Sequence, residues 1–128
     1  MSIPAKTHQT GFLALVEDAK SRIRHIDLKE YKDLAAKGEG GRLIDVREES
    51  EWNAGHAEGA TFLSKGIIER DIEKTVPDKS ERLVLYCGGG YRSALSADAL
   101  RKMGYTNVIS LDGGWKAWVE GGMPVSGK

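Results

Sequence analysis

The sequence has a single cysteine, Cys87, and it has neither an excess of one charge nor a long apolar run. One cysteine cannot form an intramolecular disulfide, which is typical of a reducing compartment. Nineteen basic residues balance nineteen acidic ones, so nothing indicates a general attraction to nucleic acid or to an anionic membrane. No stretch approaches the ~20 apolar residues of a membrane span, and residues 1–9 lack the apolar core of a signal peptide. We therefore expect a cytoplasmic protein that binds neither nucleic acid nor membrane.

Short apolar runs alternate with helical patterns along the 128 residues, a length that fits one domain. The expected strands lie at 23–26, 43–46, 60–63, 82–86 and 108–111, and the expected helices between them at 28–36, 48–54, 66–75, 93–103 and 115–120. Because these strands are continuous apolar runs, they predict an α/β fold with a mostly parallel five-stranded sheet and helices on both faces.

Asp27 is expected to cap the first helix of the alternating region, with Glu30 in the capping-box position.

Segments at both ends of the chain lie outside this alternating region. An amphipathic helix at 11–21 precedes it, so we divide the chain into an N-terminal helical extension (1–22) and an α/β domain (23–128). This first helix could cover its own sheet or pair with a neighbour, and residues from Gly121 onward are expected to form a tail.

The glycine-rich loop around Cys87 is the most informative segment for function. Cys87 follows the strand at 82–86 and is followed by Gly88, Gly89, Gly90, Tyr91, Arg92 and Ser93, after which a helix is expected. Three consecutive glycines weaken regular structure, so we interpret them as backbone that curls around a ligand in conformations that a Cβ disfavours. Amides of residues 88–93 and the helix N-terminus would then stabilise negative charge on the sulfur or on a bound oxyanion. We therefore interpret Cys87 as a nucleophile at the C-terminal end of a central strand.

The side chains near Cys87 allow functional and structural interpretations. Arg92 could hold an anionic substrate by forked hydrogen bonds, or it could pair with a nearby carboxylate. Ser93 is expected to be the helix N-cap, and Tyr91 could either shape the mouth of the pocket or lie on the surface. Lys65 follows the third strand, close enough to the same edge of the sheet to offer a second positive charge. No metal site is expected, because the histidines lack ligand spacing: His8, His25 and His56.

The loop and its surroundings resemble the rhodanese (thiosulfate sulfurtransferase) family, in particular its single-domain members. Four segments between residues 24 and 125 carry the resemblance: Asp45-Val46-Arg47 with Glu51-Trp52 and Gly55–Ala60, Ser64-Lys65-Gly66 with Glu69, the loop Cys87–Ser93, and Gly113-Gly114-Trp115 with Trp118. The first is similar to the signature D-x-R-x-x-x-E-[YFW]-x-x-G-H-x-x-G-A. The second departs from the family's P-R-G-x-x-E stretch at its proline and its arginine.

The resemblance implies a sulfurtransferase that needs no cofactor. The thiolate of Cys87 would take the outer sulfur of thiosulfate or another small sulfur donor, and residues 88–92 would cradle the resulting persulfide. Cyanide, or a thiol such as glutathione or a thioredoxin-like protein, would then accept the sulfur. The resemblance also implies that Asp45 and Arg47 brace the site.

Two other classes of protein are compatible with the same pattern. Phosphatases and arsenate reductases of this fold have five residues between cysteine and arginine, whereas four separate Cys87 from Arg92 here. The shorter loop favours a sulfur atom over a phosphoryl group. Rhodanese-like modules that only bind a partner usually lack the cysteine, which this chain retains.

Overall fold

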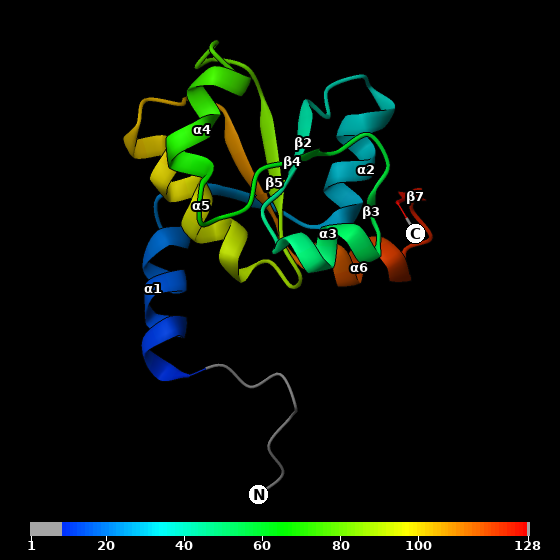
Figure 1. The fold of residues 1–128 in the computed structure, drawn as a ribbon, viewed down its shortest axis with the longest axis horizontal. Coiled ribbons are helices and arrows are strands. Elements are labelled where there is room, and N and C mark those ends of the chain that lie inside the picture. The colour runs from blue at the N-terminus through cyan, green and yellow to red at the C-terminus, as the bar shows by residue number, and fades with distance from the viewer. Residues whose placement is uncertain (1–8, 128) are drawn as a thin grey trace, which may run out of the picture.

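A five-stranded parallel sheet forms the centre of the molecule, in the strand order β1-β6-β5-β2-β4 (Figure 1). The computed structural model describes residues 9–127. All pairings within this sheet are parallel, which confirms the predicted α/β fold. The strands are β1 (Arg24–Ile26), β2 (Arg42–Asp45), β4 (Thr61–Phe62), β5 (Leu83–Tyr86) and β6 (Val108–Leu111).

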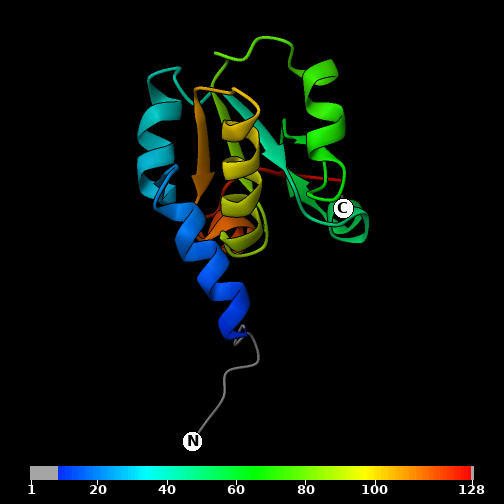
Figure 2. The same cartoon turned by 90° about the vertical axis from the view of Figure 1, so that its left-hand side faces the viewer.

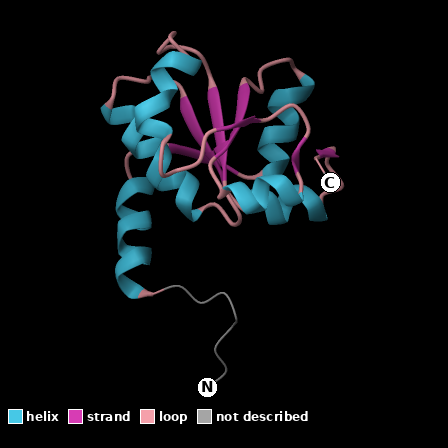
Figure 3. Cartoon of the chain, viewed as in Figure 1, coloured by secondary structure: helices cyan, strands magenta, loops and turns pink. Residues whose placement is uncertain are grey.

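Helices cover both faces of the sheet, as predicted (Figure 3). On one face, α4 (Ile68–Thr75) and α5 (Tyr91–Lys102) join a buried apolar cluster with the sheet, and on the other face α2 (Leu28–Ala36) and α6 (Gly114–Glu120) contribute to a second one. The central strand β5 is apolar on both sides because it is buried along its whole length between these layers. No helix in the range 9–127 has both the length and the apolar character needed to cross a membrane.

Local signals in the sequence set several helix ends. Asp27 accepts a hydrogen bond from the Glu30 N–H, and the Glu30 side chain accepts one from the Asp27 N–H, which is the predicted capping box. The start of α5 differs from the prediction, because this helix begins at Tyr91 with Gly90 at its N-cap. The prediction that Ser93 caps this helix is therefore wrong.

A second, two-stranded sheet was not predicted. In it, β3 (His56–Ala57) pairs antiparallel with β7 (Val125–Ser126), so part of the expected tail returns to the domain. The short helix α3 (Glu49–Ala54) connects β2 to this region. The C-terminal segment therefore pairs with the chain that directly follows α3.

The second half of the N-terminal helix α1 (Thr10–Lys20) packs against α5. The first half projects past the end of the sheet (Figure 2). Val16 and Ala19 are buried in this contact. Polar contacts fix the same end of α1, because the Arg22 guanidinium donates to both carboxylate oxygens of Asp98 at 3.1 and 2.8 Å. Arg101 also donates to this carboxylate, at 3.2 Å. The Asp98 side chain is only 8% exposed, so its charge depends on these partners.

The ion pair between Asp98 and Arg22 predicts a pH-dependent stability. Hydrogen bonds from Arg22, supported by Arg101, lower the pKa of the Asp98 carboxyl well below its usual range. A lowered pKa in the folded state means that this stabilisation is complete above the unfolded value of about 3.9 and declines as the pH falls below it. We expect Asp98→Asn to lower the free energy of unfolding by about 1–2 kcal/mol at pH 7, and this difference to shrink below pH ~4.

Urea unfolding at several pH values measures this effect. Asp33→Asn is the matched control, since Asp33 is exposed on α2 and makes no ion pair with any described residue. An equal loss in both variants, or a loss in Asp98→Asn that is the same at pH 3 and pH 7, would contradict this assignment.

Candidate active site

Cys87 is the first residue after β5, at the C-terminal edge of the sheet. β5 is buried along its whole length and pairs with β2 and β6 on its two sides, so the cysteine leaves a central strand, as predicted. Its side chain is 1% exposed. The backbone N–H of Gly90 donates to Sγ at 3.1 Å, so the loop folds back over the sulfur. Among residues 9–127 this is the only backbone amide bonded to Sγ, whereas the sequence predicted a ring of amides from residues 88–93.

The three loop glycines differ in their conformational demands. Only Gly90 has a positive φ, +99°, and a Cβ there would lie 3.1 Å from the Gly113 nitrogen. A Cβ on Gly89 would meet nothing closer than the Tyr91 ring at 3.6 Å, and one on Gly88 would lie 3.3 Å from the Arg92 guanidinium. All three glycines were expected to adopt backbone conformations that residues with a Cβ disfavour. Among the three, only Gly90 does so.

The start of α6, after the turn from β6, holds the cysteine loop through backbone hydrogen bonds. The Trp115 N–H donates to the Cys87 carbonyl at 2.7 Å, and the Lys116 N–H donates to the Gly88 carbonyl at 3.1 Å. Gly114 also has a positive φ, +47°, and a Cβ there would collide with the Cys87 carbonyl. The Gly113-Gly114 pair therefore allows the close approach of two backbones, which holds the cysteine loop in place.

Ser93 lies inside α5, where its hydroxyl is buried near the sulfur. Its Oγ is 3.6 Å from the Cys87 Sγ and 2.8 Å from the Ser110 Oγ. Ser110 comes from β6, so the two hydroxyls connect a strand, a helix and the thiol. Sequence reasoning missed Ser110, although a polar residue within the apolar run Val108–Leu111 could have indicated it.

A buried network joins β2 to β5 just before the cysteine. Asp45, which is 0% exposed, accepts hydrogen bonds from Arg47 Nη2 at 2.8 Å and from the Tyr86 hydroxyl at 2.6 Å. Arg47 also donates to the Gly55 carbonyl at 2.7 Å, and the Tyr86 oxygen accepts the Ala57 N–H at 3.0 Å. Burial, followed by the hydrogen bond to Asp45, raises the pKa of Tyr86. Asp45 and Arg47 are thus linked to Tyr86, the residue before Cys87, and neither of them is hydrogen-bonded to Sγ.

Arg92 is held by a carboxylate. Its Nη1 and Nη2 donate to the two carboxylate oxygens of Glu51 at 3.0 and 3.1 Å, while Glu51 also accepts the Glu48 N–H at 3.0 Å. These hydrogen bonds from Arg92 lower the pKa of Glu51 despite its partial burial, so the pair stays ionised and has no net charge at neutral pH. Of the two predicted interpretations of Arg92, the structure shows the ion pair.

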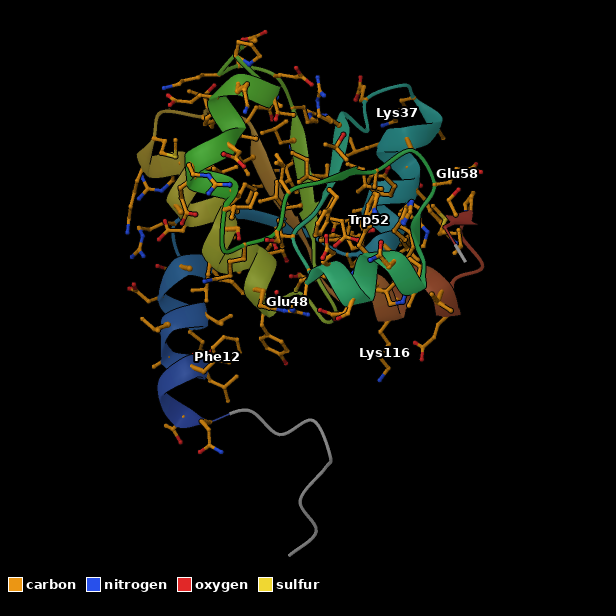
Figure 4. The ribbon with its side chains drawn as sticks, viewed as in Figure 1. Phe12, Lys37, Glu48, Trp52, Glu58 and Lys116 are labelled. Atoms are coloured by element: carbon orange, nitrogen blue, oxygen red, sulfur yellow. The ribbon has the colours of Figure 1, made fainter. Side chains whose placement is uncertain are left out.

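Two lysines near this edge make no ion pair with any other described residue, Lys65 and Lys116. The Lys65 N–H bonds to the Val46 carbonyl, and the Val46 N–H bonds to the Tyr86 carbonyl. Lys65 therefore lies on the same edge as Cys87 but two strands away from it. The Lys116 side chain points outward at the same end of the molecule as Glu48 (Figure 4). Sequence reasoning did not single out Lys116.

Tyr91 packs against the N-terminal helix. Its ring centroid lies 6.1 Å from that of Phe12 and 5.8 Å from the Lys20 Nζ, both on α1. The predicted alternatives for Tyr91, the pocket mouth or the free surface, did not include this contact. It links the extension directly to the cysteine loop.

His25 and His56 each contact another side chain. His25 Nδ1 lies 2.8 Å from an Asp112 carboxylate oxygen, and the His56 ring stacks on Trp52 at a centroid distance of 3.4 Å. His8 lies outside the described residues. Within residues 9–127, no group of three or more His, Cys, Asp or Glu side chains could hold a metal ion.

A buried cysteine lies under a glycine loop at the end of a central strand of a parallel α/β sheet. The chain belongs to the rhodanese-like domain family, whose model matches residues 27–121. The helix α1 precedes the matched region.

Several named relatives are similar to this chain. A thiosulfate sulfurtransferase of Pseudomonas entomophila is 35% identical over 85 residues, covering 66% of this chain and 76% of that protein. A probable adenylyltransferase/sulfurtransferase of Mycobacterium tuberculosis is 34% identical over 92 residues, covering 72% of this chain but only 24% of that protein. The chain thus spans about a quarter of the length of this mycobacterial relative.

Solved structures show the same fold. A polysulfide-sulfur transferase homodimer from Wolinella succinogenes has a TM-score of 0.75 and 28% identity, covering 91% of this chain and 87% of that one. A protein of unknown function from Rhodopseudomonas palustris, described as a possible tyrosine phosphatase, has a TM-score of 0.83 and 27% identity, covering 98% of this chain and 100% of that one.

The different roles of the glycines predict different effects of adding a methyl group. Gly90→Ala should reduce the sulfurtransferase rate about fivefold or more, because a Cβ at positive φ costs ~1 kcal/mol and moves the amide away from Sγ. Gly89→Ala should lose much less activity, since its Cβ meets only ordinary contacts. Steady-state rates, with circular dichroism to monitor folding, measure this. An equal loss in both variants would show that the Gly90 geometry is not what the reaction needs.

Proposed function

We propose that this protein is a sulfurtransferase that carries a sulfane sulfur on Cys87 as a persulfide. The observation that supports this best is the sulfur held under its own loop, with the Gly90 N–H 3.1 Å from Sγ. A backbone N–H that donates to sulfur stabilises negative charge that develops there during a reaction. The named sulfurtransferases among the relatives support the same reaction class.

The proposed reaction with thiosulfate has two steps. In the first, the Cys87 thiolate attacks the outer sulfur, the sulfur–sulfur bond of thiosulfate breaks, and sulfite leaves with the electron pair. In the second, an external thiolate or cyanide attacks the outer sulfur of the persulfide, and the Cys87 thiolate leaves. Each step forms one bond to sulfur and breaks another, so no further oxidant or reductant is required.

The surroundings of Cys87 suit these steps. With no second cysteine in the chain, the persulfide cannot be resolved internally, so the acceptor must be an external nucleophile such as glutathione or a thioredoxin-like protein. Residues 88–92 would enclose the transferred sulfur, and Ser93 would offer its hydroxyl beside Sγ. Among residues 9–127, Lys65 and Lys116 near this edge make no ion pair, so an anionic donor would meet their charges.

A phosphatase is the competing function, because one structural neighbour is described as a possible tyrosine phosphatase. Four residues separate Cys87 from Arg92, which leaves less room than the five-residue loops of phosphatases with this fold. Arg92 is also engaged with both carboxylate oxygens of Glu51. Both observations favour sulfur transfer over phosphoryl transfer.

The homodimeric neighbour suggests a proposal about assembly. The match covers 91% of this chain. Residues 1–20, which end with α1, make up more of the chain than the part left uncovered, so the match must include most of α1. That neighbour is a polysulfide-sulfur transferase homodimer. We therefore include self-association, and polysulfide as a second class of donor, in the proposed function.

Sulfur loading of Cys87 tests the function directly. After incubation with thiosulfate, the intact mass should increase by one sulfur atom, and cyanide should remove it with formation of thiocyanate. Cys87→Ser should abolish both changes. If the wild-type protein gains no sulfur from thiosulfate or from polysulfide, the proposal is wrong, and hydrolysis of p-nitrophenyl phosphate that depends on Cys87 would favour the phosphatase.

The neutral Arg92–Glu51 pair predicts a specific gain for an anionic donor. Glu51→Gln keeps the hydrogen-bonding shape and removes the negative charge, so the Arg92 charge becomes available to the thiosulfate dianion. The KM for thiosulfate should fall about threefold or more at low salt, and the gain should fade near 1 M salt. Steady-state kinetics over a range of ionic strength measure this.

Glu49→Gln is the control for that experiment. Glu49 is an exposed neighbour on α3 without an ion pair among the described residues, so its substitution changes the net charge equally. A KM that falls by the same amount in both variants would mean that only the overall charge matters. A lower kcat in Glu51→Gln with unchanged KM would show that the pair serves only to position the loop.

A further inference from the structure

Ser110 is a buried polar side chain on an otherwise apolar strand. It lies on β6, is 0% exposed, and is in register with Leu85 of β5, two residues before Cys87. Side chains in register, and those two residues apart along a strand, point to the same face of a sheet. Leu85 and Cys87 also share one buried cluster with α5. The Ser110 hydroxyl therefore lies on the face of the sheet that carries the thiol.

The Ser110 hydroxyl has its hydrogen-bond partner on α5. Its Oγ lies 2.8 Å from the Oγ of Ser93, which is also completely buried. Burying a hydroxyl is costly unless it is hydrogen-bonded, and among residues 9–127 Ser93 is the only partner of this one. The Ser93 Oγ in turn lies 3.6 Å from the Cys87 Sγ. The three side chains therefore form a row that ends at the sulfur.

The number of protons in this row depends on the state of the sulfur. Two contacts join the three groups, one between Sγ and Ser93 and one between Ser93 and Ser110. A thiol and two hydroxyls bring three protons, one more than these contacts can use. A thiolate and two hydroxyls bring two protons, one for each contact. With the thiolate, Ser110 donates to Ser93 and Ser93 donates to Sγ.

We propose that Ser110 is a positioning residue for sulfur transfer, which acts through Ser93 by directing the Ser93 O–H toward Sγ. While Ser110 donates to the Ser93 Oγ, the Ser93 proton is left to point at the sulfur, and adjacent hydrogen bonds of this kind strengthen one another. This role rests on the proposed function, because negative charge returns to Sγ when an acceptor takes the outer sulfur of the persulfide. A hydroxyl that donates to Sγ stabilises this charge.

A double-mutant cycle on the full chain tests this role, with the rate at which cyanide removes sulfur from the loaded protein as the readout. Ser93→Ala removes the donor to Sγ and should slow this step about tenfold. Ser110→Ala leaves the donor but lets it turn among its staggered positions, so it should slow the step about threefold. Because Ser110 acts through Ser93, the double variant should be no slower than Ser93→Ala. Intact mass over time measures the loss of one sulfur atom.

Ser96→Ala is the matched control. Ser96 is buried on the same helix, and its hydroxyl has no hydrogen-bond partner among the described residues. Its substitution removes a buried hydroxyl without altering the row, so the rate should stay within about twofold of the wild type. Urea unfolding of all variants monitors the fold.

The cycle has outcomes of opposite meaning. Slower removal in both single variants, with no further loss in the double variant, supports the role of Ser110. A rate in Ser110→Ala that matches Ser96→Ala, or a double variant that loses the product of both effects, overturns it. Faster removal in Ser110→Ala also overturns it, because loosening a purely structural tie between β6 and α5 would only expose the sulfur.

A methyl disulfide on Cys87 separates this role from the proposed function. Methyl methanethiosulfonate installs it, and attack of dithiothreitol on the outer sulfur releases the Cys87 thiolate, so the same cycle runs without a sulfur donor. If the wild-type chain gains no sulfur but the disulfide gives the expected cycle, the proposed function fails and the role of Ser110 stands. If Cys87 accepts neither group, both are overturned.

Discussion

The Asp45 carboxylate, which is completely buried, is the constraint on which the rest of the site depends. A buried charge must be paired, and removing one partner of such a pair typically costs about 3–5 kcal/mol. Arg47, two residues after β2, and the Tyr86 hydroxyl on β5 satisfy it, and the Tyr86 oxygen in turn accepts the Ala57 N–H. Tyr86 immediately precedes Cys87, so the network that neutralises Asp45 also fixes the direction in which the chain enters the loop.

The fold could be predicted from the sequence where local patterns and burial agree. The run at Leu83–Tyr86 is buried along its whole length, and a strand buried on both faces is a nearly continuous apolar run, which is the pattern that the sequence shows. The antiparallel pair of β3 and β7 could not be predicted in this way. Each strand has only two residues, too few to show a period, and they come from opposite ends of the domain.

The start of α5 shows tertiary contacts overriding a local signal. Ser93 is a favoured N-cap residue, yet its hydroxyl lies within hydrogen-bond reach of Ser110, a contact across the fold. Gly90 takes the cap position instead, with the positive φ that turns its amide toward the sulfur. Local sequence signals also could not identify the partner of Arg92, which was expected to be either an anionic substrate or a nearby carboxylate. Its partner Glu51 is 41 residues away, so only the folded chain identifies it.

These pairings leave the sulfur in a site whose formal charges largely cancel. Asp45 neutralises Arg47 and Glu51 neutralises Arg92, so the interactions that act on Sγ at short range are the Gly90 N–H and the Ser93 hydroxyl. Dipoles of this kind act over a few ångströms and depend strongly on direction. The sulfur transfer proposed for Cys87 would therefore depend on the geometry of the loop more than on the net charge around it. Because Tyr91 of that loop contacts α1, this control extends to a helix outside the region that the family model matches.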